Sequence, residues 1–383
     1  MKRSDTVYKI PFNRPCFQGK ELAYISEAIQ GGQISGNGTF TQRCQAQLSH
    51  ELDGAKVILT TSCTDALEMA AILLDLAPGD EVIMPTFTFV STANAFALRG
   101  ARPVFVDIRP DTLNLDETRV ARAVSPRTKA IVAVHYAGVG CDMAALTAIA
   151  GEHGLVLIED NAHGLFGRQG GKPLGTFGAL STLSFHETKN FTCGEGGALV
   201  VNDDSFAERA EIIRDKGTNR ARFFRGEVDK YSWVDIGSSF LPSDILAAFL
   251  LAQLEARERI QAQRKEIWEY YAEHLCDWAK RGGVTLPTVP EGCEQAYHMF
   301  YILMPSLAAR TAMIEHLRSA GILAVFHYAP LHLSRMGLAL SGKTEECPVA
   351  EDVADRLLRL PFYNDFTDSD QKAVVAAIKS CAL

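Results

Sequence analysis

Short runs of apolar residues, separated by longer mixed segments, dominate the chain between positions 56 and 201. Most runs are continuous rather than alternating, which is typical of strands that are covered on both faces of a sheet. Seven runs are candidate strands: 56–59, 81–84, 104–106, 131–134, 155–158, 182–185 and 198–201.

Segments with helical spacing lie between several of these runs. The apolar positions of segment 64–76 fall on one helical stripe, and segment 143–150 is a second candidate helix. Alternating strands and helices predict an α/β fold with a mainly parallel seven-stranded sheet flanked by helices. In such sheets ligands bind at the carboxyl ends of the strands.

The pattern changes after Ser243. A long helical stretch begins at Ile245, continues to Leu275 and ends at Gly282 and Gly283. We interpret it as the link between a large domain, residues 1–255, and a smaller α+β domain, residues 256–383. The apolar runs 297–304 and 322–326 are the predicted strands of the smaller domain.

Composition narrows the class of protein. The chain has 383 residues, 47% of them hydrophobic, which is enough for two globular cores. A net charge of −8 argues against nucleic-acid binding, and nine scattered cysteines argue against a disulfide framework or a metal site. No apolar segment follows Met1–Asp5 and none reaches the length of a membrane span, so we expect a cytoplasmic protein without a membrane partner.

Lys189 and Asp160 carry the strongest chemical signal. Lys189 lies in a loop between a predicted strand and the glycine cluster Gly194–Gly197. Such a lysine can lose its proton and form an imine with an aldehyde cofactor. Asp160 ends an apolar strand, where a carboxylate must be paired or functional, and it could keep a pyridine nitrogen protonated. Together they indicate a pyridoxal-phosphate enzyme.

Other candidates are weaker when taken singly. The turn at Ser62–Thr64 could bind phosphate at a helix N-terminus, or Thr64 could simply cap that helix. Phe89 could stack on a cofactor ring or pack in the core. His163 could reach the cofactor's phenolic oxygen or be a core histidine, and Ser184 could add a phosphate contact.

The chain resembles the DegT/StrS sugar-nucleotide aminotransferases, which are fold-type-I pyridoxal-phosphate enzymes. The resemblance runs nearly end to end and includes the Ser62–Thr64 turn and the lysine loop. It also includes Ile10–Asn13, Gly36–Gly38, Glu159–His163, His327–His332 and Leu360–Phe362. It implies transfer of an amino group from L-glutamate to a 4-keto-6-deoxy sugar nucleotide, and a homodimer with active sites at the subunit interface.

The resemblance also implies residue roles. The cofactor would be pyridoxal 5'-phosphate, with pyridoxamine 5'-phosphate as the intermediate form, and Lys189 would be both Schiff-base lysine and proton shuttle. Asp160 would pair with the pyridine nitrogen. The other implied cofactor ligands are His163, where many relatives carry glutamine, Phe89 on the ring, and Cys63, Thr64 and Ser184 on the phosphate. Ser239 stands where the family has a phosphate-binding asparagine from the neighbouring subunit.

Substrate contacts are less defined. A basic stretch could bind the diphosphate or the glutamate carboxylates, or could be a solvated loop. Its members are Arg220, Arg222, Arg225 and Lys230. His327 and His332 are candidates to line the sugar pocket.

Four alternative functions remain. The sequence does not fix the ring carbon, so a 3-keto sugar-nucleotide aminotransferase is one. A pyridoxal-dependent sugar 3-dehydrase would have histidine at the position of Lys189. A non-catalytic pyridoxal-phosphate-binding regulatory module would usually carry a DNA-binding segment, and no basic helix-turn-helix precedes position 20. A nicotinamide-dependent oxidoreductase would need a Gly-x-Gly-x-x-Gly after the first strand, which is missing.

Overall fold

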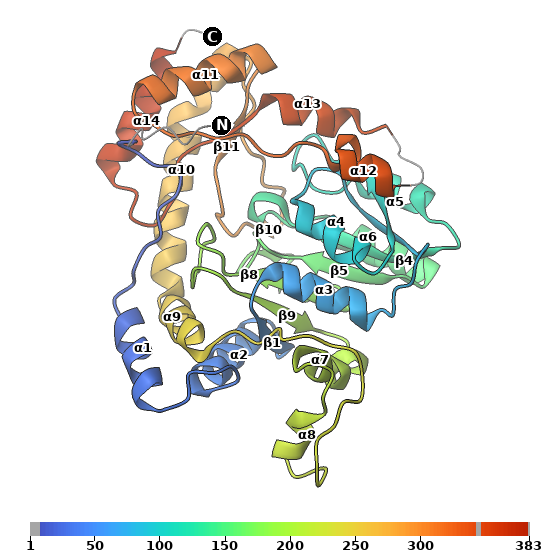
Figure 1. Ribbon diagram of the computed structural model, residues 1–383. Helices are drawn as coiled ribbons and strands as arrows, with labels where there is room; N and C mark the ends of the chain where they lie inside the picture. The colour runs from blue at the N-terminus through green and yellow to red at the C-terminus, as the bar shows by residue number, and fades with distance from the viewer. Residues whose placement is uncertain (1–7, 342–345, 382–383) are drawn as a thin grey trace.

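A twisted seven-stranded sheet forms the centre of the computed structural model, which describes residues 8–341 and 346–381 (Figure 1). The strand order is β1-β9-β8-β5-β4-β2-β3, and only β9 runs antiparallel to its neighbours. The strands are β1 (Lys56–Thr60), β2 (Glu81–Pro85), β3 (Arg102–Val106), β4 (Thr128–Val134), β5 (Val156–Asp160), β8 (Leu180–Ser184) and β9 (Gly197–Val201). The predicted α/β fold with a mainly parallel seven-stranded sheet is confirmed.

Helices cover both faces of the sheet, which explains the continuous apolar runs. Within β1, Ile58 packs into one helical layer, while Val57 and Leu59 pack into the other. The first layer contains α3 (Cys63–Leu73), α4 (Val90–Ala97) and α7 (Ala207–Arg214). The second contains α2 (Thr39–Glu51) and α9 (Asp244–Glu255) on the side of β1. Farther along the sheet it contains α5 (Glu117–Ala123) near β3 and α6 (Met143–His153) near β4 and β5.

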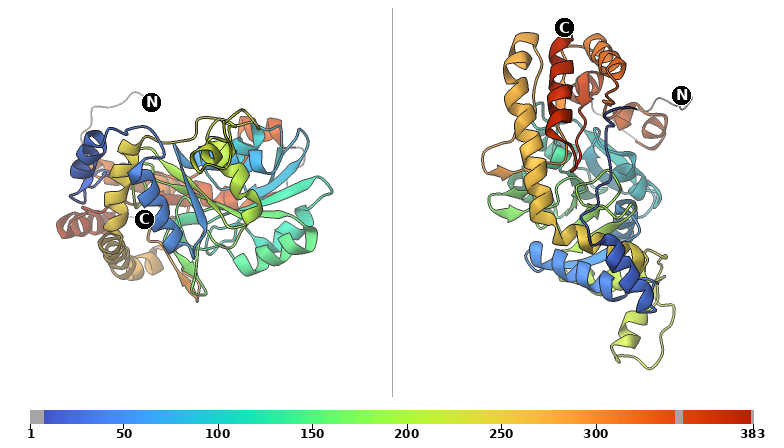
Figure 2. Two further views of the ribbon diagram at one scale, coloured as in Figure 1. Left: turned by 90° about the horizontal axis from the view of Figure 1, so that it is seen from below. Right: turned by 90° about the vertical axis from the view of Figure 1, so that its left-hand side faces the viewer.

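Smaller elements lie around this core. α1 (Glu21–Gln30) packs against α9, and α8 (Arg220–Phe224) projects away from the sheet next to α7 (Figures 1 and 2). A small sheet pairs β10 (Cys293–Glu294) with β6 (Arg168–Gln169), and β6 with β7 (Lys172–Pro173). The 3-10 helices are Tyr136–Gly138, Asp204–Phe206 and Leu331–Leu333.

The C-terminal part is organised along α10 (Arg257–Gly282), which follows α9 after a break at Ala256 and ends at Gly283 with φ +64°. α10 shares a separate apolar core with α11 (Leu307–Ser319) and α14 (Asp368–Ser380). α12 (Arg335–Leu340) and α13 (Pro348–Arg356) complete this part. The domain boundary after residue 255 stays a prediction, and it falls at the break between α9 and α10.

One strand prediction is wrong. Of the predicted strand 297–304 the structure keeps β11 (Tyr301–Leu303), which pairs with β12 (Leu357–Arg359). Segment 322–326 makes only isolated bridges, from Ile322 to Ile10 and from Val325 to Arg359. Ile322 and Ala324 are therefore buried without a continuous ladder, and Phe326 is 60% exposed. Hydrophobic pattern alone does not separate such a segment from a strand.

The first residues of the chain, 1–7, lie outside the described part, and with them the segment Met1–Asp5 used above. Among the helices of the described residues, none is long and apolar enough to span a bilayer.

Candidate active site

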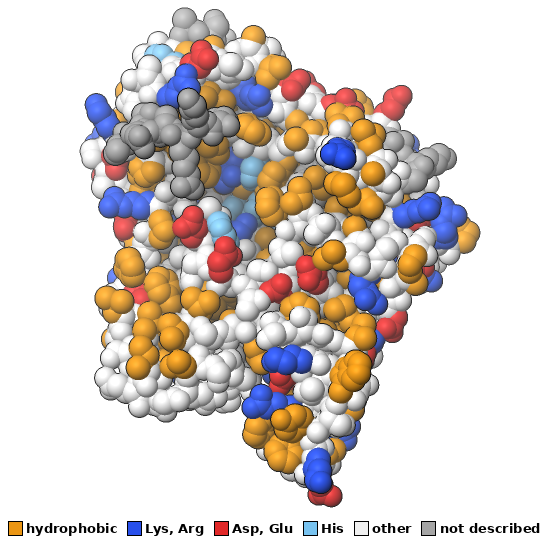
Figure 3. Space-filling model, in the orientation of Figure 1, with side chains coloured by type: hydrophobic (Ala, Val, Ile, Leu, Met, Phe, Trp, Pro, Cys, Tyr) orange, Lys and Arg blue, Asp and Glu red, His pale blue; other side chains and the backbone are white. Residues whose placement is uncertain are grey.

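A cavity of about 710 Å³ opens at the carboxyl edge of the sheet. Figure 3 shows a hollow on one face of the molecule with basic and histidine side chains at its bottom. Because β1, β2, β5 and β8 run in the same direction, the residues that follow them meet at this edge. The predicted residues that line the cavity are Cys63, Thr64, Phe89, Asp160, His163, Ser184, Lys189 and His327.

Lys189 lies in a loop that closes on itself between β8 and β9. Phe185 N–H donates to Gly196 O at 2.8 Å, and Glu187 N–H donates to Gly194 O at 2.9 Å. These bonds hold the lysine over the cavity. Burial lowers the pKa of Lys189 to about 8, although Cys63 and Asp160 act in the opposite direction. A neutral amine, the form that attacks a carbonyl, is thus accessible near neutral pH.

Asp160 is the last residue of β5 and is 6% exposed. Thr92 Oγ1 donates to its Oδ2 at 2.7 Å, and the Ala162 N–H donates to its Oδ1 at 3.3 Å. Thr92 is itself bonded to Thr88 at 2.9 Å. A carboxylate accepts about four hydrogen bonds, so Asp160 has acceptor capacity left for a donor inside the cavity.

His163 presents a buried nitrogen without a partner. Its Nδ1 has no hydrogen bond among the described residues, and its ring stacks on His298 at 4.1 Å between centroids. Burial, with the nearby charge of Lys189, lowers the pKa of His163 well below its usual value. The ring is therefore neutral and has one nitrogen free for a ligand.

The turn between β1 and α3 forms another wall of the cavity. Ser62 Oγ accepts from the Asp65 N–H at 3.0 Å and caps α3, leaving the N–H groups of Cys63 and Thr64 at the start of the helix. Burial raises the pKa of the Cys63 thiol to about 12, so it adds no negative charge there. A Cβ on Gly197 would lie 2.3 Å from Cys63 N, so only glycine lets β9 approach this turn.

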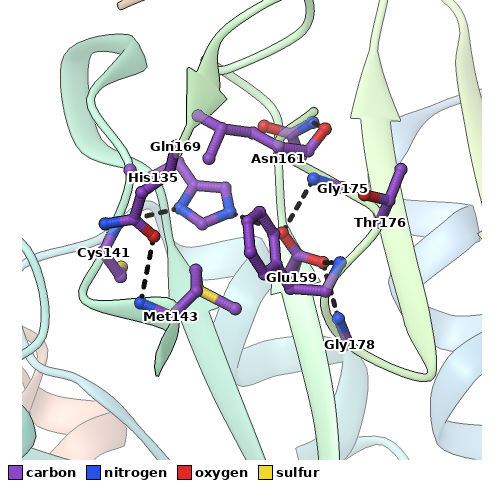
Figure 4. A network of polar contacts seen from close by, with 12 residues as sticks. His135, Cys141, Met143, Glu159, Asn161, Gln169, Gly175, Thr176 and Gly178 are labelled. Carbon is purple, nitrogen blue, oxygen red and sulfur yellow. Dashed lines mark hydrogen bonds and ion pairs between the residues drawn. The ribbon is translucent and has the colours of Figure 1, made fainter. Parts of the chain in front are cut away.

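A buried polar network fixes the back of the site (Figure 4). Glu159, next to Asp160 on β5, accepts from the N–H groups of Gly175, Phe177 and Gly178, each at 2.7 Å. His135 Nδ1 accepts from the Cys141 N–H at 3.2 Å, which leaves Nε2–H to donate to Glu159 at 2.8 Å. These bonds tie the ends of β4 and β5 to the loop before β8 and hold Asp160 in position.

Some predicted residues lie elsewhere. Arg220, Arg222, Arg225 and Lys230 do not line the cavity of their own chain. They lie on and after α8, where Arg222 and Arg225 pair with Glu208, Glu211 and Glu227. Ser239 is exposed beyond this segment. His332 is buried between Thr86, at 2.7 Å, and Glu351, at 3.1 Å, so it supports the wall rather than facing the cavity.

The structure also places residues in the cavity that the sequence interpretation missed. Among them are Thr92, His298, Tyr328 and Arg359. Arg359 could have been found from the sequence. It lies within the apolar run Leu357–Leu360, where a buried charge, like that of Asp160, must be paired or functional. Thr92 and His298 gave no comparable signal in their local sequence.

These groups fit pyridoxal phosphate. Lys189 offers an amine, Asp160 a buried carboxylate and His163 an unused nitrogen, all within one cavity. The N-terminus of α3 offers backbone donors for the phosphate, and the missing side chain at Gly197 gives the room that β9 needs there. Phe89 is 56% exposed, so its ring is available for stacking.

Comparison with known proteins gives a consistent result. The model of the DegT/DnrJ/EryC1/StrS aminotransferase family matches residues 15–379. The spore coat polysaccharide biosynthesis protein SpsC of Bacillus subtilis is 31% identical over 378 residues, covering 97% of this chain and 96% of SpsC.

Solved structures agree with the sequence match. The aminotransferase TlmJ of Streptoalloteichus hindustanus is 32% identical with a TM-score of 0.87, covering 98% of this chain and 97% of its own. Spr1654 of Streptococcus pneumoniae, solved in PLP and PMP forms, is 26% identical. Its PMP form has a TM-score of 0.90, covering 97% of this chain and 99% of its own.

Proposed function

The chain belongs to the DegT/DnrJ/EryC1/StrS aminotransferase family, and from this premise we propose that it aminates the C4 ketone of TDP-4-keto-6-deoxy-D-glucose. L-glutamate is the proposed donor and TDP-4-amino-4,6-dideoxy-D-galactose the proposed product. The family makes the protein a pyridoxal-phosphate-dependent sugar aminotransferase. The observation that carries the proposal is the meeting of Lys189 and Asp160 in one cavity at the carboxyl edge of the sheet.

Two residues do most of the chemistry. Bound pyridoxal phosphate supplies an aldehyde carbon that takes up an amine and a ring that accepts electrons. Lys189 Nζ would be the amine that holds this aldehyde between turnovers, and Asp160 would keep the ring nitrogen protonated. As a free amine, Lys189 Nζ would take a proton from the donor's α-carbon and later give one to the sugar carbon. A pKa of about 8 suits both directions near neutral pH.

The overall reaction balances without a further reagent. L-glutamate loses its amino group and becomes 2-oxoglutarate, and the sugar ketone becomes a primary amine. The ketone oxygen leaves as water in one half-reaction, and a water molecule enters at the donor carbon in the other. The rings of Phe89 and Tyr328 line the cavity with their centroids 6.3 Å apart.

The choice of sugar rests on local sequence. The runs Pro78–Pro85, Val90–Phe96, Ser184–Asn190 and Lys216–Arg220 resemble those of TDP-4-amino-4,6-dideoxy-D-galactose transaminase. The name of SpsC, a polysaccharide biosynthesis protein, supports a sugar substrate in general. Cytoplasmic location stays a prediction.

A homodimer is part of the proposal. Residues 217–239, here named the arm, carry α8 and expose Phe224, Tyr231 and Trp233 by 68%, 52% and 79%. Such apolar exposure is unusual for a surface in contact with water only. In a dimer the arm would bring its arginines, Lys230 and Ser239 to the neighbouring site, where they would bind the phosphates.

Incubation with TDP-4-keto-6-deoxy-D-glucose and L-glutamate, followed by NMR of the product, tests the function. We expect nitrogen on C4 with an axial orientation, recognised by a small H3–H4 coupling. Nitrogen on C3 after incubation with the 3-keto isomer, together with no reaction at C4, would instead support a 3-keto sugar-nucleotide aminotransferase. Loss of the 3-hydroxyl without amination would support a sugar 3-dehydrase.

A further inference from the structure

Another cavity, of about 220 Å³, lies beside β1, the end strand of the central sheet. Residues of β1, α2, α7 and α8 line it, and none of them lines the active-site cavity. Sites for drug-sized ligands usually measure about 300 to 1,000 Å³, so this space suits a small molecule or an ion.

Arg214, from α7, brings a buried charge to this cavity. It is 6% exposed, its Nε is buried without a hydrogen bond, and it forms no ion pair with another described residue. Burial lowers the pKa of Arg214, and Glu211 and Asp215 act in the opposite direction, but a guanidinium keeps its charge in proteins. A buried charge without a partner is costly, and a bound anion would offset that cost.

A second buried arginine shows how the fold treats a guanidinium that has a structural role. Arg264 donates to the carbonyl oxygens of Tyr297 and His298 at 2.9 and 2.6 Å, and to Asn364 Oδ1 at 2.8 Å. The fold therefore supplies the acceptors for Arg264. For the side chain of Arg214 none of the described residues does so, which leaves its donors for a ligand.

Glu211, the carboxylate in the cavity wall, is already used by two other cations. Its Oε1 accepts from Lys56 Nζ at 2.6 Å and its Oε2 from Arg225 at 2.9 Å. Although burial raises the pKa of Glu211, these two cations lower it below its usual value. Arg225 also pairs with Glu227, which does not line the cavity. Three cations of the wall thus face one carboxylate, and Arg214 is the cation that this carboxylate does not neutralise.

Two amide side chains add neutral donors to the wall. Gln45 Oε1 accepts from the Leu59 N–H at 3.1 Å, which leaves the amide nitrogen for another acceptor. Asn37 supplies a second amide. Because these donors come from several elements rather than from one plane, they suit a tetrahedral oxyanion better than a planar carboxylate.

We propose that this cavity binds a single phosphate-type oxyanion between Arg214 and Lys56. The fork of Arg214 would hold two oxygens of the anion, and the ammonium group of Lys56 a third. The anion would join β1 and α7 to α8, the helix that begins the arm (Figure 1). Arg225 is thereby assigned to the cavity of its own chain, which leaves the other basic residues of the arm for the neighbouring site. The proposal depends on neither the sugar nor the amino donor.

Calorimetric titration of the holoenzyme with inorganic phosphate tests the proposal, with chloride added to keep the ionic strength constant. The bound cofactor fills its own phosphate site, so the titration reports other sites. We expect one phosphate per wild-type chain. In Arg214→Gln the dissociation constant should be at least about 10-fold higher than in Arg318→Gln, the control, in which an exposed arginine on α11 is replaced.

Arg222→Gln separates this cavity from the site proposed for the nucleotide phosphates. Arg222 lies on α8 but does not line the cavity, so this variant should bind phosphate as the wild type does. Loss of binding in Arg222→Gln with unchanged binding in Arg214→Gln would overturn the proposal. So would a wild type that takes up no phosphate, or equal dissociation constants in the Arg214 and Arg318 variants.

Lys56→Gln keeps the proposal testable if Arg214→Gln does not fold. Lys56 is more exposed than Arg214, so its loss should raise the dissociation constant by at least about threefold, and a smaller change overturns the proposal. Hydrogen exchange then locates the site in the wild type. Phosphate should slow exchange in segments 56–58 and 211–225, and unchanged exchange in both segments would contradict the assignment.

Discussion

At Lys189 the cavity disfavours the charge that a lysine normally carries. Burial lowers the pKa from 10.5 to about 8, so the folded protein binds this proton less tightly than the unfolded chain does. The cost to folding is full below about pH 8 and disappears as the pH rises toward 10.5, where the unfolded chain also loses the proton. A reactive amine is thus obtained at the expense of stability.

We therefore expect Lys189→Met to raise the stability of the cofactor-free protein at pH 7, by up to about 3 kcal/mol. The gain should shrink as the pH approaches 10. Thermal unfolding at several pH values measures it, with the exposed Lys379→Met on α14 as the control. If the gain in stability were the same at every pH, burial of the charged Lys189 side chain would not be what destabilises the folded protein.

Asp160→Asn keeps the shape of the side chain and an acceptor for Thr92, but it removes the negative charge. The variant should still bind the cofactor, because the phosphate turn and Lys189 are unchanged. Its turnover should fall by about 100-fold or more, since the ring nitrogen is no longer kept protonated. Steady-state rates at matched cofactor occupancy measure this, and near-normal turnover would remove the assigned role of Asp160.

At this scale the sequence predicted the residues that follow strands. Asp160 could be named because a carboxylate at the end of an apolar run must be paired or functional. Lys189 could be named because it lies in a loop between a predicted strand and a glycine cluster. His163 and Phe89 could be named as candidates only. Thr92 and His298 could not be found, since their positions depend on how α4 and the C-terminal part pack against the sheet.

Among the elements, the contact between β9 and the start of α3 controls the phosphate end of the site. We expect Gly197→Ala to destabilise the protein by about 1–3 kcal/mol and to weaken cofactor binding, because the added Cβ collides with the backbone at Ser62 and Cys63. Gly151→Ala in α6 meets nothing within 4 Å and should be neutral or slightly stabilising. Unfolding in denaturant and cofactor titration measure both, and equal behaviour of the two variants would contradict this description.

The sheet was the most predictable element because its strands are covered on both faces and read as unbroken apolar runs. Strand order could not be read in the same way. β9 pairs on one side with β8, which precedes it in the sequence, and on the other side with β1, the first strand of the chain, and only the assembled sheet shows the second pairing. β12 was missed for a related reason, since it is short and its partner β11 is more than 50 residues away.

At the scale of the whole molecule, the arm is the feature that a single chain leaves unexplained. Its exposed aromatic residues and its arginines lie away from the cavity of their own chain. Sequence could suggest the basic stretch but not its location, because the arm's path is set by α7 and by the bridge from Thr218 to Trp233.

The proposed dimer makes the arm testable. The double substitution Phe224→Ser and Trp233→Ser should shift the protein from dimer to monomer and weaken cofactor binding, because apolar contact area is lost at the interface. Leu307→Ser, an exposed apolar residue on α11, should do neither. Sedimentation equilibrium measures the mass, and a wild-type monomer that holds cofactor tightly would contradict the shared site.

The central claim is that one particular amine holds the cofactor. Reduction of the holoenzyme with borohydride makes that bond permanent, and mass spectrometry of the digested protein locates it. The account predicts the pyridoxyl phosphate mass on the peptide that contains Lys189, and its absence from that site when Lys189 is replaced by arginine. A label on another lysine, or no covalent label in a protein that contains cofactor, would contradict it.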